Sequence, residues 1–571
     1  MNEWWRKAVV YQIYPKSFND TTGDGIGDLR GVIEKLDYLA ELGVDVLWLT
    51  PVYASPQRDN GYDISDYRRI HEAYGTMEDF EELLREAHAR GLKVMMDMVV
   101  NHTSTDHPWF QQARRSKDNP RRNFYIWKKG RNDGPPTNWL SKFGGSAWKK
   151  DERTGEYYLH LFDVTQADLN WEYPPVREEV YDMMRWWLDK GVDGFRLDVI
   201  NLISKDQRFP DDPEGDGRPF YTDGPRIHEY LQEMNREVFS KYDMVTVGEM
   251  SSTSISECIQ YTRPNRRELD MTFQFHHLKV DYPNGEKWAQ GDMDFLRLKR
   301  ILAEWQTEMH AGGGWNALFW CNHDQPRIVS RYGDDGLWHT ESAKMLATVI
   351  HLMQGTPYIY QGEEFGMTNP QFVSIDEYRD VETHNMYRIL LQQGKDEEEV
   401  MKVIREKSRD NARTPMQWDN SKNAGFTDGT PWIGVAHNYA TINAERALSD
   451  SNSIFYHYKE LIRLRKTYDI VTTGGFQLLL EEHPDLFAYL RNGDHEKLLV
   501  VNNFRGHDTV FTLPREVSHL SDWTGECLLS NYADSPTDFR MLTLRPYESV
   551  VYRLTPRSEA KGGAERTGCD G

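Results

Sequence analysis

Acidic side chains stand at the ends of several short apolar runs in this chain. Asp97 lies in KVMMDMVVNH and Asp198 ends the apolar part of GFRLDVI. Glu249 follows in MVTVGEM and Asp324 in NALFWCNHD. One such acid can be a helix cap, but four together are hard to explain as caps. Two carboxylates suffice to cleave a glycosidic bond, one attacking the anomeric carbon while the other protonates the leaving oxygen. The residue types therefore predict a glycosidase site.

Arg196 stands two residues before Asp198, so on a strand both side chains point to the same face. We expect the guanidinium to keep Asp198 ionised, as a nucleophile requires. Glu249 needs a raised pKa to act as the acid. Partial burial and neighbouring carboxylates supply such a shift.

These residues need a scaffold that brings strand ends together. Eight apolar runs alternate with amphipathic segments, at 9–15, 45–51, 93–102, 194–200, 244–250, 269–275, 316–324 and 356–364. The alternation predicts an α/β fold, a (β/α)8 TIM barrel, and near-continuous apolar runs are typical of buried parallel strands. Reactive residues in such a barrel gather at the carboxyl ends of the strands.

The chain is long enough for more than one structural unit. We predict a first barrel part at 1–103, an inserted loop-rich subdomain at 104–172, and a second barrel part at 173–475. LFAYLRNGDHEKLLVVNNF contains two β runs around a turn and indicates a C-terminal antiparallel β domain at 476–556. Residues 557–571 have almost no apolar content and are predicted to be disordered.

Composition excludes several classes of function. The net charge of −22 over 571 residues argues against a nucleic-acid partner. No run of about 18 apolar residues predicts a membrane span, and the first residues do not resemble a secretory signal. The four cysteines are scattered, without metal-ligand spacing. We expect a cytoplasmic monomer that acts on a small molecule.

DMVVNH, GFRLD, VGEM and NHDQPR resemble the four signature regions of the alpha-amylase superfamily. QADLNW (166–171) resembles the fifth, as found in the oligo-1,6-glucosidase group. The resemblance covers nearly the whole chain. It implies a retaining mechanism with Asp198 as nucleophile, Glu249 as acid/base and Asp324 as transition-state stabiliser. It also implies that the sugar at the cleavage point contacts His102, Arg196 and His323.

DNGYDI (59–64) and ARTPMQW (412–418) resemble the glucose-end pocket of the same family. The resemblance implies that Asp59 and Arg413 pair to close the site, and that Tyr62 stacks on the terminal glucose. A closed pocket of this kind removes one end glucose and does not cut a polymer internally.

DTTGDGIGDLRG (20–31) places acids at positions 20, 24 and 28 of a glycine-rich loop. The spacing is typical of calcium loops, and the alternative is a solvated acidic turn. The resemblance favours a structural Ca²⁺ or Mg²⁺, and its ligands would be Asp20, Thr22, Asp24, the carbonyl of Ile26, and Asp28. No cofactor is expected for the chemistry itself.

FHHLKVDYPNGEKW (275–288) follows the sixth predicted strand and would lie at the active-site face. An anionic substrate approaching a strongly acidic protein needs a local positive site, and lysines are good phosphate partners. We therefore predict substrate contacts from His277, Lys279 and Lys287, with Lys142 of the insertion as an alternative phosphate contact. A solvated loop is the other interpretation.

Three segments, HHLKVDYPNGEKW, FWCNHDQPR and VGEMSSTS, are together similar to those of the phospho-α-glucosidases of the superfamily. That similarity implies a phosphorylated disaccharide as substrate and hydrolysis of the α,α-1,1 linkage of trehalose 6-phosphate. The main alternative is an oligo-1,6-glucosidase, or a sucrose- or trehalose-isomerising relative, acting on neutral α-glucosides. A non-catalytic barrel, as in amino-acid-transporter heavy chains, is disfavoured because the acid set is complete.

Overall fold

The structure is a computed structural model that describes residues 3–213, 215–534 and 536–557. The tail 557–571 is predicted to be disordered. Only Arg557 of this tail belongs to the described residues.

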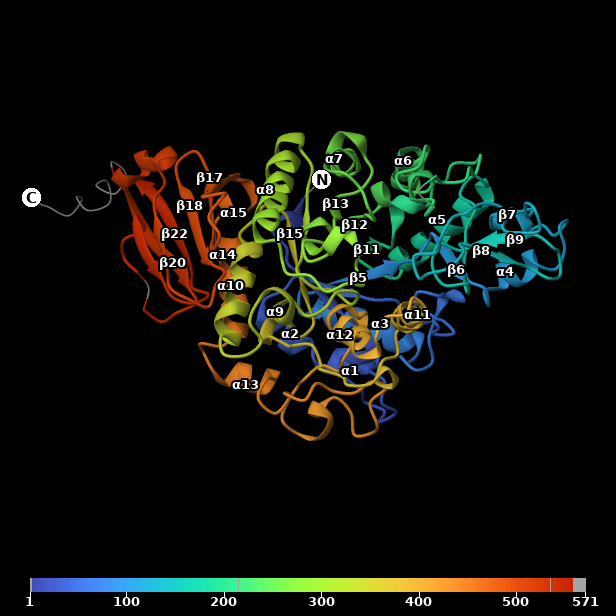
Figure 1. The fold of residues 1–571 in the computed structure, drawn as a ribbon, viewed down its shortest axis with the longest axis horizontal. Helices are drawn as coiled ribbons and strands as arrows, with labels where there is room; N and C mark the ends of the chain where they lie inside the picture. The colour runs from blue at the N-terminus through green and yellow to red at the C-terminus, as the bar shows by residue number, and fades with distance from the viewer. Residues whose placement is uncertain (1–2, 214, 535, 558–571) are drawn as a thin grey trace, which may run out of the picture.

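Eight parallel strands form the centre of the molecule (Figure 1). They are β1 (Val10–Ile13), β2 (Val46–Leu49), β5 (Lys93–Met98), β11 (Gly194–Leu197), β12 (Val245–Glu249), β13 (Met271–Phe273), β14 (Ala317–Leu318) and β15 (Thr356–Tyr360). Their order in the sheet is β13-β12-β11-β5-β2-β1-β15-β14. A parallel bridge between Thr272 and Asn316 joins the two ends, so the sheet closes into the predicted barrel.

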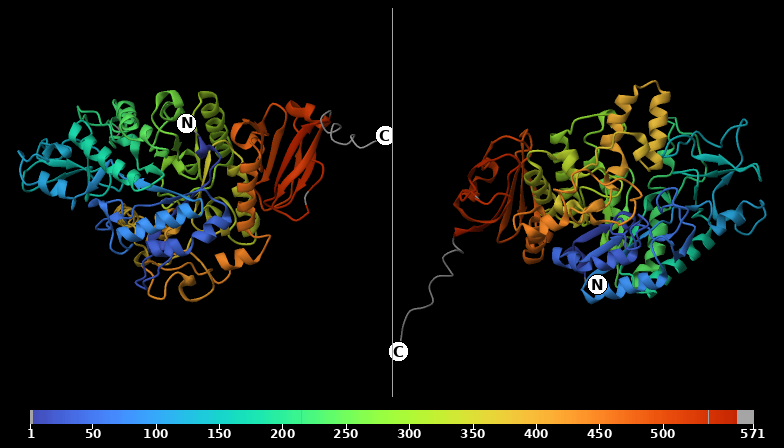
Figure 2. Two further views of the ribbon diagram at one scale, coloured as in Figure 1. Left: turned by 180° about the vertical axis from the view of Figure 1, so that it is seen from behind. Right: turned by 90° about the horizontal axis from the view of Figure 1, so that it is seen from below.

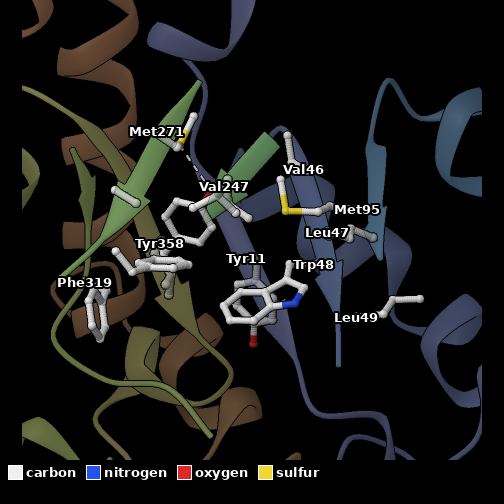
Figure 3. Packing of buried hydrophobic residues seen from close by; sticks show 14 of the residues in the cluster. Tyr11, Val46, Leu47, Trp48, Leu49, Met95, Val247, Met271, Phe319 and Tyr358 are labelled. Atoms are coloured by element: carbon white, nitrogen blue, oxygen red, sulfur yellow. Dashed lines mark hydrogen bonds between the residues drawn. The ribbon is translucent and has the colours of Figure 1, made fainter. Parts of the chain in front are cut away.

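Large side chains fill the barrel interior (Figure 3). Trp48 and Tyr358 meet edge to face at 6.0 Å between ring centroids, and Phe273 packs on Tyr358 at 4.6 Å. All three are buried, so the barrel is a packed core and not a channel.

Amphipathic helices surround this barrel. They include α1 (Leu29–Glu34), α2 (Leu36–Leu42), α3 (Met77–Ala89), α5 (Pro174–Asp189), α6 (Ile227–Glu237), α7 (Ile255–Thr262), α8 (Phe295–Gly312), α10 (His339–His351) and α14 (Ile454–Thr467). Helix α3 illustrates why they form: Thr76 and Asp79 make a capping box at its start, and its buried residues follow the helical period.

The insertion between β5 and β11 contains β6 (His102–Ser104), α4 (Pro108–Ala113), β7 (Trp127–Lys128), β8 (Trp148–Lys150), β9 (Tyr157–Leu159) and β10 (Gln166–Asp168). Strand β10 pairs antiparallel with β6, and Asp168 lies opposite His102. Trp139 and Trp148 belong to a small hydrophobic core of this region. The insertion is therefore anchored where β5 reaches the mouth of the barrel.

A five-stranded antiparallel sheet ends the described chain. Its strands are β16 (Gly475–Leu479), β17 (Leu486–Asn492), β18 (Lys497–Asn503), β22 (Ser549–Pro556) and β20 (Trp523–Ser530), in that spatial order. Strands β19 (Thr509–Thr512) and β21 (Met541–Leu544) form a separate pair. Both views of Figure 2 place this sheet at the end of the molecule opposite the insertion. The fold class is confirmed, and the residue boundaries of the domains stay predictions.

Two further helices follow β15, α11 (Val381–Gln392) and α12 (Glu397–Lys407), and they pack against each other. The short turn Arg409–Ala412 comes directly after them. Across the residues that the model describes, none of the helices combines the length and the apolarity that crossing a bilayer requires.

Candidate active site

A cavity of about 260 Å³ opens at the carboxyl ends of the barrel strands. Most of the residues predicted from the sequence line it, namely Asp59, Tyr62, His102, Asp198, Glu249, Lys279, Lys287 and Asp324. Arg196, His323 and Arg413 are almost fully buried and bind residues of the cavity wall from behind. The structure thus brings together residues from widely separated motifs.

Arg196 holds three carboxylates at once. Its Nη1 lies 2.7 Å from Asp198 Oδ1 and 2.8 Å from Asp97 Oδ1, and its Nη2 lies 2.8 Å from Glu249 Oε2. The strand register explains this arrangement, because Arg196 sits opposite Asp97 on β5 and opposite Val247 on β12. One guanidinium therefore fixes both predicted reacting acids relative to each other.

Arg196 favours the ionised form of Asp198, as predicted, but burial opposes this effect. Burial raises the pKa of Asp198 to about 7, although the charge of Arg196 works in the opposite direction. Burial likewise raises the pKa of Glu249 to about 7, and the charge of Asp198 adds to the shift. A single cation does not fully offset the desolvation of three neighbouring acids, so the pKa values of both Asp198 and Glu249 are raised.

Asp324 has a different environment. Burial raises its pKa, but the contact with His323 and the charges of Arg409 and Arg413 outweigh that effect and hold the pKa well below the usual range. Arg413 Nη2 lies 2.7 Å and Arg409 Nη1 lies 3.4 Å from Asp324 Oδ1. Asp324 thus stays ionised over the pH range in which Asp198 and Glu249 gain or lose their protons. Carboxylates whose environments separate their pKa values can take separate roles.

Neutral imidazoles support the inner end of the cavity. Burial lowers the pKa of His102 to about 4 and that of His323 to about 3. The His323 ring stacks on Tyr62 at 5.2 Å between centroids, with an angle of 6° between the planes. The Tyr62 hydroxyl donates to Asp97 Oδ2 at 2.8 Å. The phenol ring is therefore fixed in orientation at the cavity wall.

The expected pair of Asp59 and Arg413 is replaced by another. Asp59 Oδ1 pairs with Arg409 Nη2 at 3.1 Å, and Gln166 Nε2 donates to Asp59 Oδ2 at 3.0 Å. Arg413 instead binds Asp324 and donates to the carbonyl of His323 at 2.9 Å. Arg409 was missed from the sequence, although it precedes Arg413 by four residues in SRDNAR, a spacing that puts both on one side of a helical turn.

Three lysines occupy the cavity wall away from Asp59. Lys287 Nζ contacts both oxygens of Glu382, at 2.9 and 2.8 Å. Lys142 Nζ donates to Ser251 Oγ at 3.1 Å. Burial and the nearby Arg218 lower the pKa of Lys279. Burial, Arg218 and Lys279 together lower the pKa of Lys142 to about 7, although Asp216 and Glu249 act in the opposite direction.

His277 does not join the cavity, contrary to the prediction. It is buried, with Nε2 2.8 Å from the carbonyl oxygen of Phe319 and Nδ1 3.0 Å from the side chain of Gln274. Burial lowers its pKa to about 4. Its environment is that of a neutral core histidine with both nitrogens occupied.

The acids of the predicted cation loop accept hydrogen bonds from nearby backbone amides. Asp20 accepts from the amides of Thr22, Gly23 and Gly25, and Asp28 accepts from those of Thr21 and Gly31. Asp24 is exposed and accepts from the amide of Ile26 at 2.9 Å. Among the described residues, no group of three or more acidic, histidine or cysteine side chains is placed to hold a metal ion. The structural cation stays a prediction.

Comparisons with known proteins agree with this geometry. Residues 12–474 match the model of the alpha-amylase catalytic domain, and residues 486–551 match the alpha-amylase SusG C-terminal domain. Trehalose-6-phosphate hydrolase of Bacillus subtilis is 66% identical over 97% of this chain and 98% of its own length. Oligo-1,6-glucosidase of Parageobacillus thermoglucosidasius is 57% identical, over 96% of this chain and 99% of its own.

A solved structure extends the likeness to three dimensions. The crystal structure of Bacillus licheniformis trehalose-6-phosphate hydrolase superposes with a TM-score of 0.94 at 67% identity, covering 97% of this chain and all of that one. With a complete acid set at the mouth of a closed barrel, the chain belongs to the alpha-amylase family and is a glycoside hydrolase.

Proposed function

We propose that this glycosidase hydrolyses the α,α-1,1 linkage of trehalose 6-phosphate to glucose and glucose 6-phosphate, with retention at the anomeric carbon. The observation that carries the proposal is the pair Lys142 and Lys279, two cations whose pKa values are depressed. Both line the cavity, in a chain with a net charge of −22. Two neighbouring cations that are partly withdrawn from water are suited to binding an anion.

The unphosphorylated glucose would occupy the inner end. Asp198 attacks its anomeric carbon and forms a covalent bond. At the same time, Glu249 gives its proton to the bridging oxygen, the bond from carbon to that oxygen breaks, and glucose 6-phosphate leaves. Asp324, which keeps its negative charge, stabilises the positive charge that develops on the ring. The mechanism requires Asp198 to be ionised and Glu249 to be protonated, and the raised pKa of Glu249 favours its protonated form.

Water completes the reaction. Glu249 takes a proton from a water molecule, whose oxygen attacks the anomeric carbon, and the bond to Asp198 breaks. The released glucose has the α configuration. Asp59, paired with Arg409 and Gln166, would bind the hydroxyl groups of the glucose at the closed end.

The phosphorylated ring would lie outward. Lys142 reaches the cavity from the insertion, and Lys279 reaches it from the loop after β13. Lys287 is a weaker candidate than the sequence suggested, because Glu382 already neutralises it. His277 is not part of the proposed contact.

A structural cation in the loop 20–28 belongs to this proposal as a separate element. Asp20 and Asp28 would hold it together with the hydroxyl of Thr22, which lies 3.1 Å from Asp20 Oδ1. Such an ion would add stability to the folded state and take no part in bond cleavage.

A neutral α-glucoside is the second candidate substrate, favoured by the Lys287–Glu382 pair and by the oligo-1,6-glucosidases among the relatives. Glucose release from trehalose 6-phosphate, trehalose and isomaltose at equal concentrations separates the two. We expect kcat/KM to be at least tenfold higher for trehalose 6-phosphate, as one charge-assisted contact predicts. Equal values for trehalose 6-phosphate and trehalose would remove the phosphate from the proposal.

A further inference from the structure

Glu382 is an acid in the wall of a cavity that we propose receives a phosphate. It is the second residue of α11, and its side chain is 10% exposed. It lines the same cavity as Lys279 and Lys287. A carboxylate in this position repels a dianionic substrate, so its presence needs an explanation.

The contacts of Glu382 concentrate on Lys287. Both carboxylate oxygens lie within 2.9 Å of Lys287 Nζ, while the distance from Glu382 Oε2 to Arg409 Nε is 3.4 Å. Arg409 has other counter-charges, because it also pairs with Asp59 and Asp380. In the part of the chain that the structure describes, Lys287 forms no ion pair other than the one with Glu382. Lys287 therefore depends on Glu382, and Arg409 does not.

We infer that Glu382 is a specificity-determining residue that acts as an internal counter-anion for Lys287. The inference rests on the proposed function. When the cavity is empty or holds a neutral sugar, Glu382 neutralises the Lys287 ammonium. A substrate phosphate competes with Glu382 for that ammonium and is also repelled by the carboxylate. Glu382 thereby weakens the binding of phosphorylated substrate and product, and it leaves neutral disaccharides unaffected by charge.

The experiment compares kcat/KM for trehalose 6-phosphate and for trehalose in each variant. E382Q keeps the size of the side chain and removes its charge. We expect the ratio of the two kcat/KM values to rise about five- to tenfold, the effect of removing one like charge near the phosphate in a partly solvated site. The inhibition constant of glucose 6-phosphate should fall by a similar factor.

E286Q is the matched control. Glu286 is adjacent to Lys287 in the sequence, but it is exposed and does not line the cavity. This variant removes the same charge from the same loop, so the ratio should stay at the wild-type value. A rise equal to that of E382Q would show a general field effect and would overturn the assignment to Glu382.

Two further variants test the pairing. K287A leaves Glu382 without its counter-charge, so the ratio should fall below wild type. Adding E382Q to K287A should recover part of that loss, because the unpaired carboxylate is then gone. If the double variant is no better than K287A, Glu382 is not the counter-anion.

The outcomes separate this inference from the proposed function. A wild-type enzyme without preference for trehalose 6-phosphate refutes the proposed function. A wild-type enzyme with that preference, whose ratio E382Q leaves unchanged or lowers, refutes only the role of Glu382. Equal changes in kcat/KM for both substrates in E382Q would indicate a purely geometric role and would also overturn the inference.

Discussion

At the scale of single residues, the shared guanidinium of Arg196 controls how the acids behave. Asp198, Glu249 and Asp97 are all positioned by this one buried group, which pairs with each of them through its terminal nitrogens. We therefore expect that Asp198, the proposed nucleophile, can be altered without loosening the strand that precedes it.

Asp198→Asn should reduce kcat by roughly 10⁴-fold or more, since the amide cannot form the glycosyl-enzyme. The melting temperature should stay near that of the wild type. NMR of the wild-type reaction should show α-glucose as the first free glucose. Wild-type turnover in the variant, or β-glucose as the first product, would contradict the assignment.

The pH dependence follows from the raised pKa values of Asp198 and Glu249, both about 7. Below that pH the nucleophile becomes protonated, and above it the acid loses its proton, so kcat/KM should fall on both sides. We expect a narrow bell with its maximum near pH 7, measured between about pH 5 and pH 9. The two apparent values belong to the pair. A broad plateau across this range would show that the acids titrate far apart.

Lys279→Ala and Lys142→Ala should each lower kcat/KM for trehalose 6-phosphate by about ten- to a hundredfold, because a charge-assisted contact contributes about 1.5–3 kcal/mol. Trehalose cleavage should change far less. Lys150→Ala, an exposed lysine of the insertion, is the control. High salt should reduce the wild-type preference, because part of the attraction is screened. If both variants keep the wild-type ratio, the phosphate binds elsewhere.

At the scale of elements, the loop 20–28 offers a test without substrate. If Asp20 and Asp28 hold a cation, removing divalent ions with a chelator should lower the melting temperature by a few degrees, since binding to the folded state adds stability by mass action. The initial rate at 25 °C should stay close to its original value. Asp28→Asn should remove the response to added Ca²⁺, and a melting curve indifferent to the chelator would favour the acidic turn.

The secondary-structure elements could be predicted from the sequence more accurately than the side-chain contacts between them. All eight barrel strands lie inside the predicted runs, because buried parallel strands leave a clear apolar signal. The run 316–324 was too long, since only Ala317–Leu318 is strand and the rest leads to His323 and Asp324. The pairing of Asp59 with Arg409 joins residues 350 positions apart. Local patterns carry no information about such a contact, nor about the burial that raises the pKa of Asp198.

At the scale of the whole molecule, the barrel and the C-terminal sheet are joined through a buried lysine. Lys299 of α8 donates to the carbonyls of Leu480, His483 and Leu486 at 3.0, 2.8 and 3.1 Å. Lys299→Ala should lower the free energy of unfolding by about 2–4 kcal/mol, since it leaves these acceptors unpaired. Thermal or denaturant unfolding measures the loss, and kcat/KM at 25 °C should be unchanged.

Arg300→Gln is the control for that variant. Arg300 lies on the same helix and contacts the same region through Glu481 and Glu482, but these ion pairs are exposed. Exposed pairs contribute little, so stability should change by less than about 1 kcal/mol. An equal loss in both variants would mean that charge, and not the buried carbonyl contacts, joins the two parts.

The reacting acids Asp198 and Glu249 sit at strand ends, whereas Lys142 and Lys279 belong to loops. Loops tolerate replacement and insertion better than barrel strands do. Selection can therefore exchange one substrate for another without disturbing bond cleavage. Two relatives with different names are accordingly each more than half identical to this chain. The same division makes the chain a candidate for grafting, in which the segment 275–288 from a relative is transplanted to redirect the enzyme toward a new sugar.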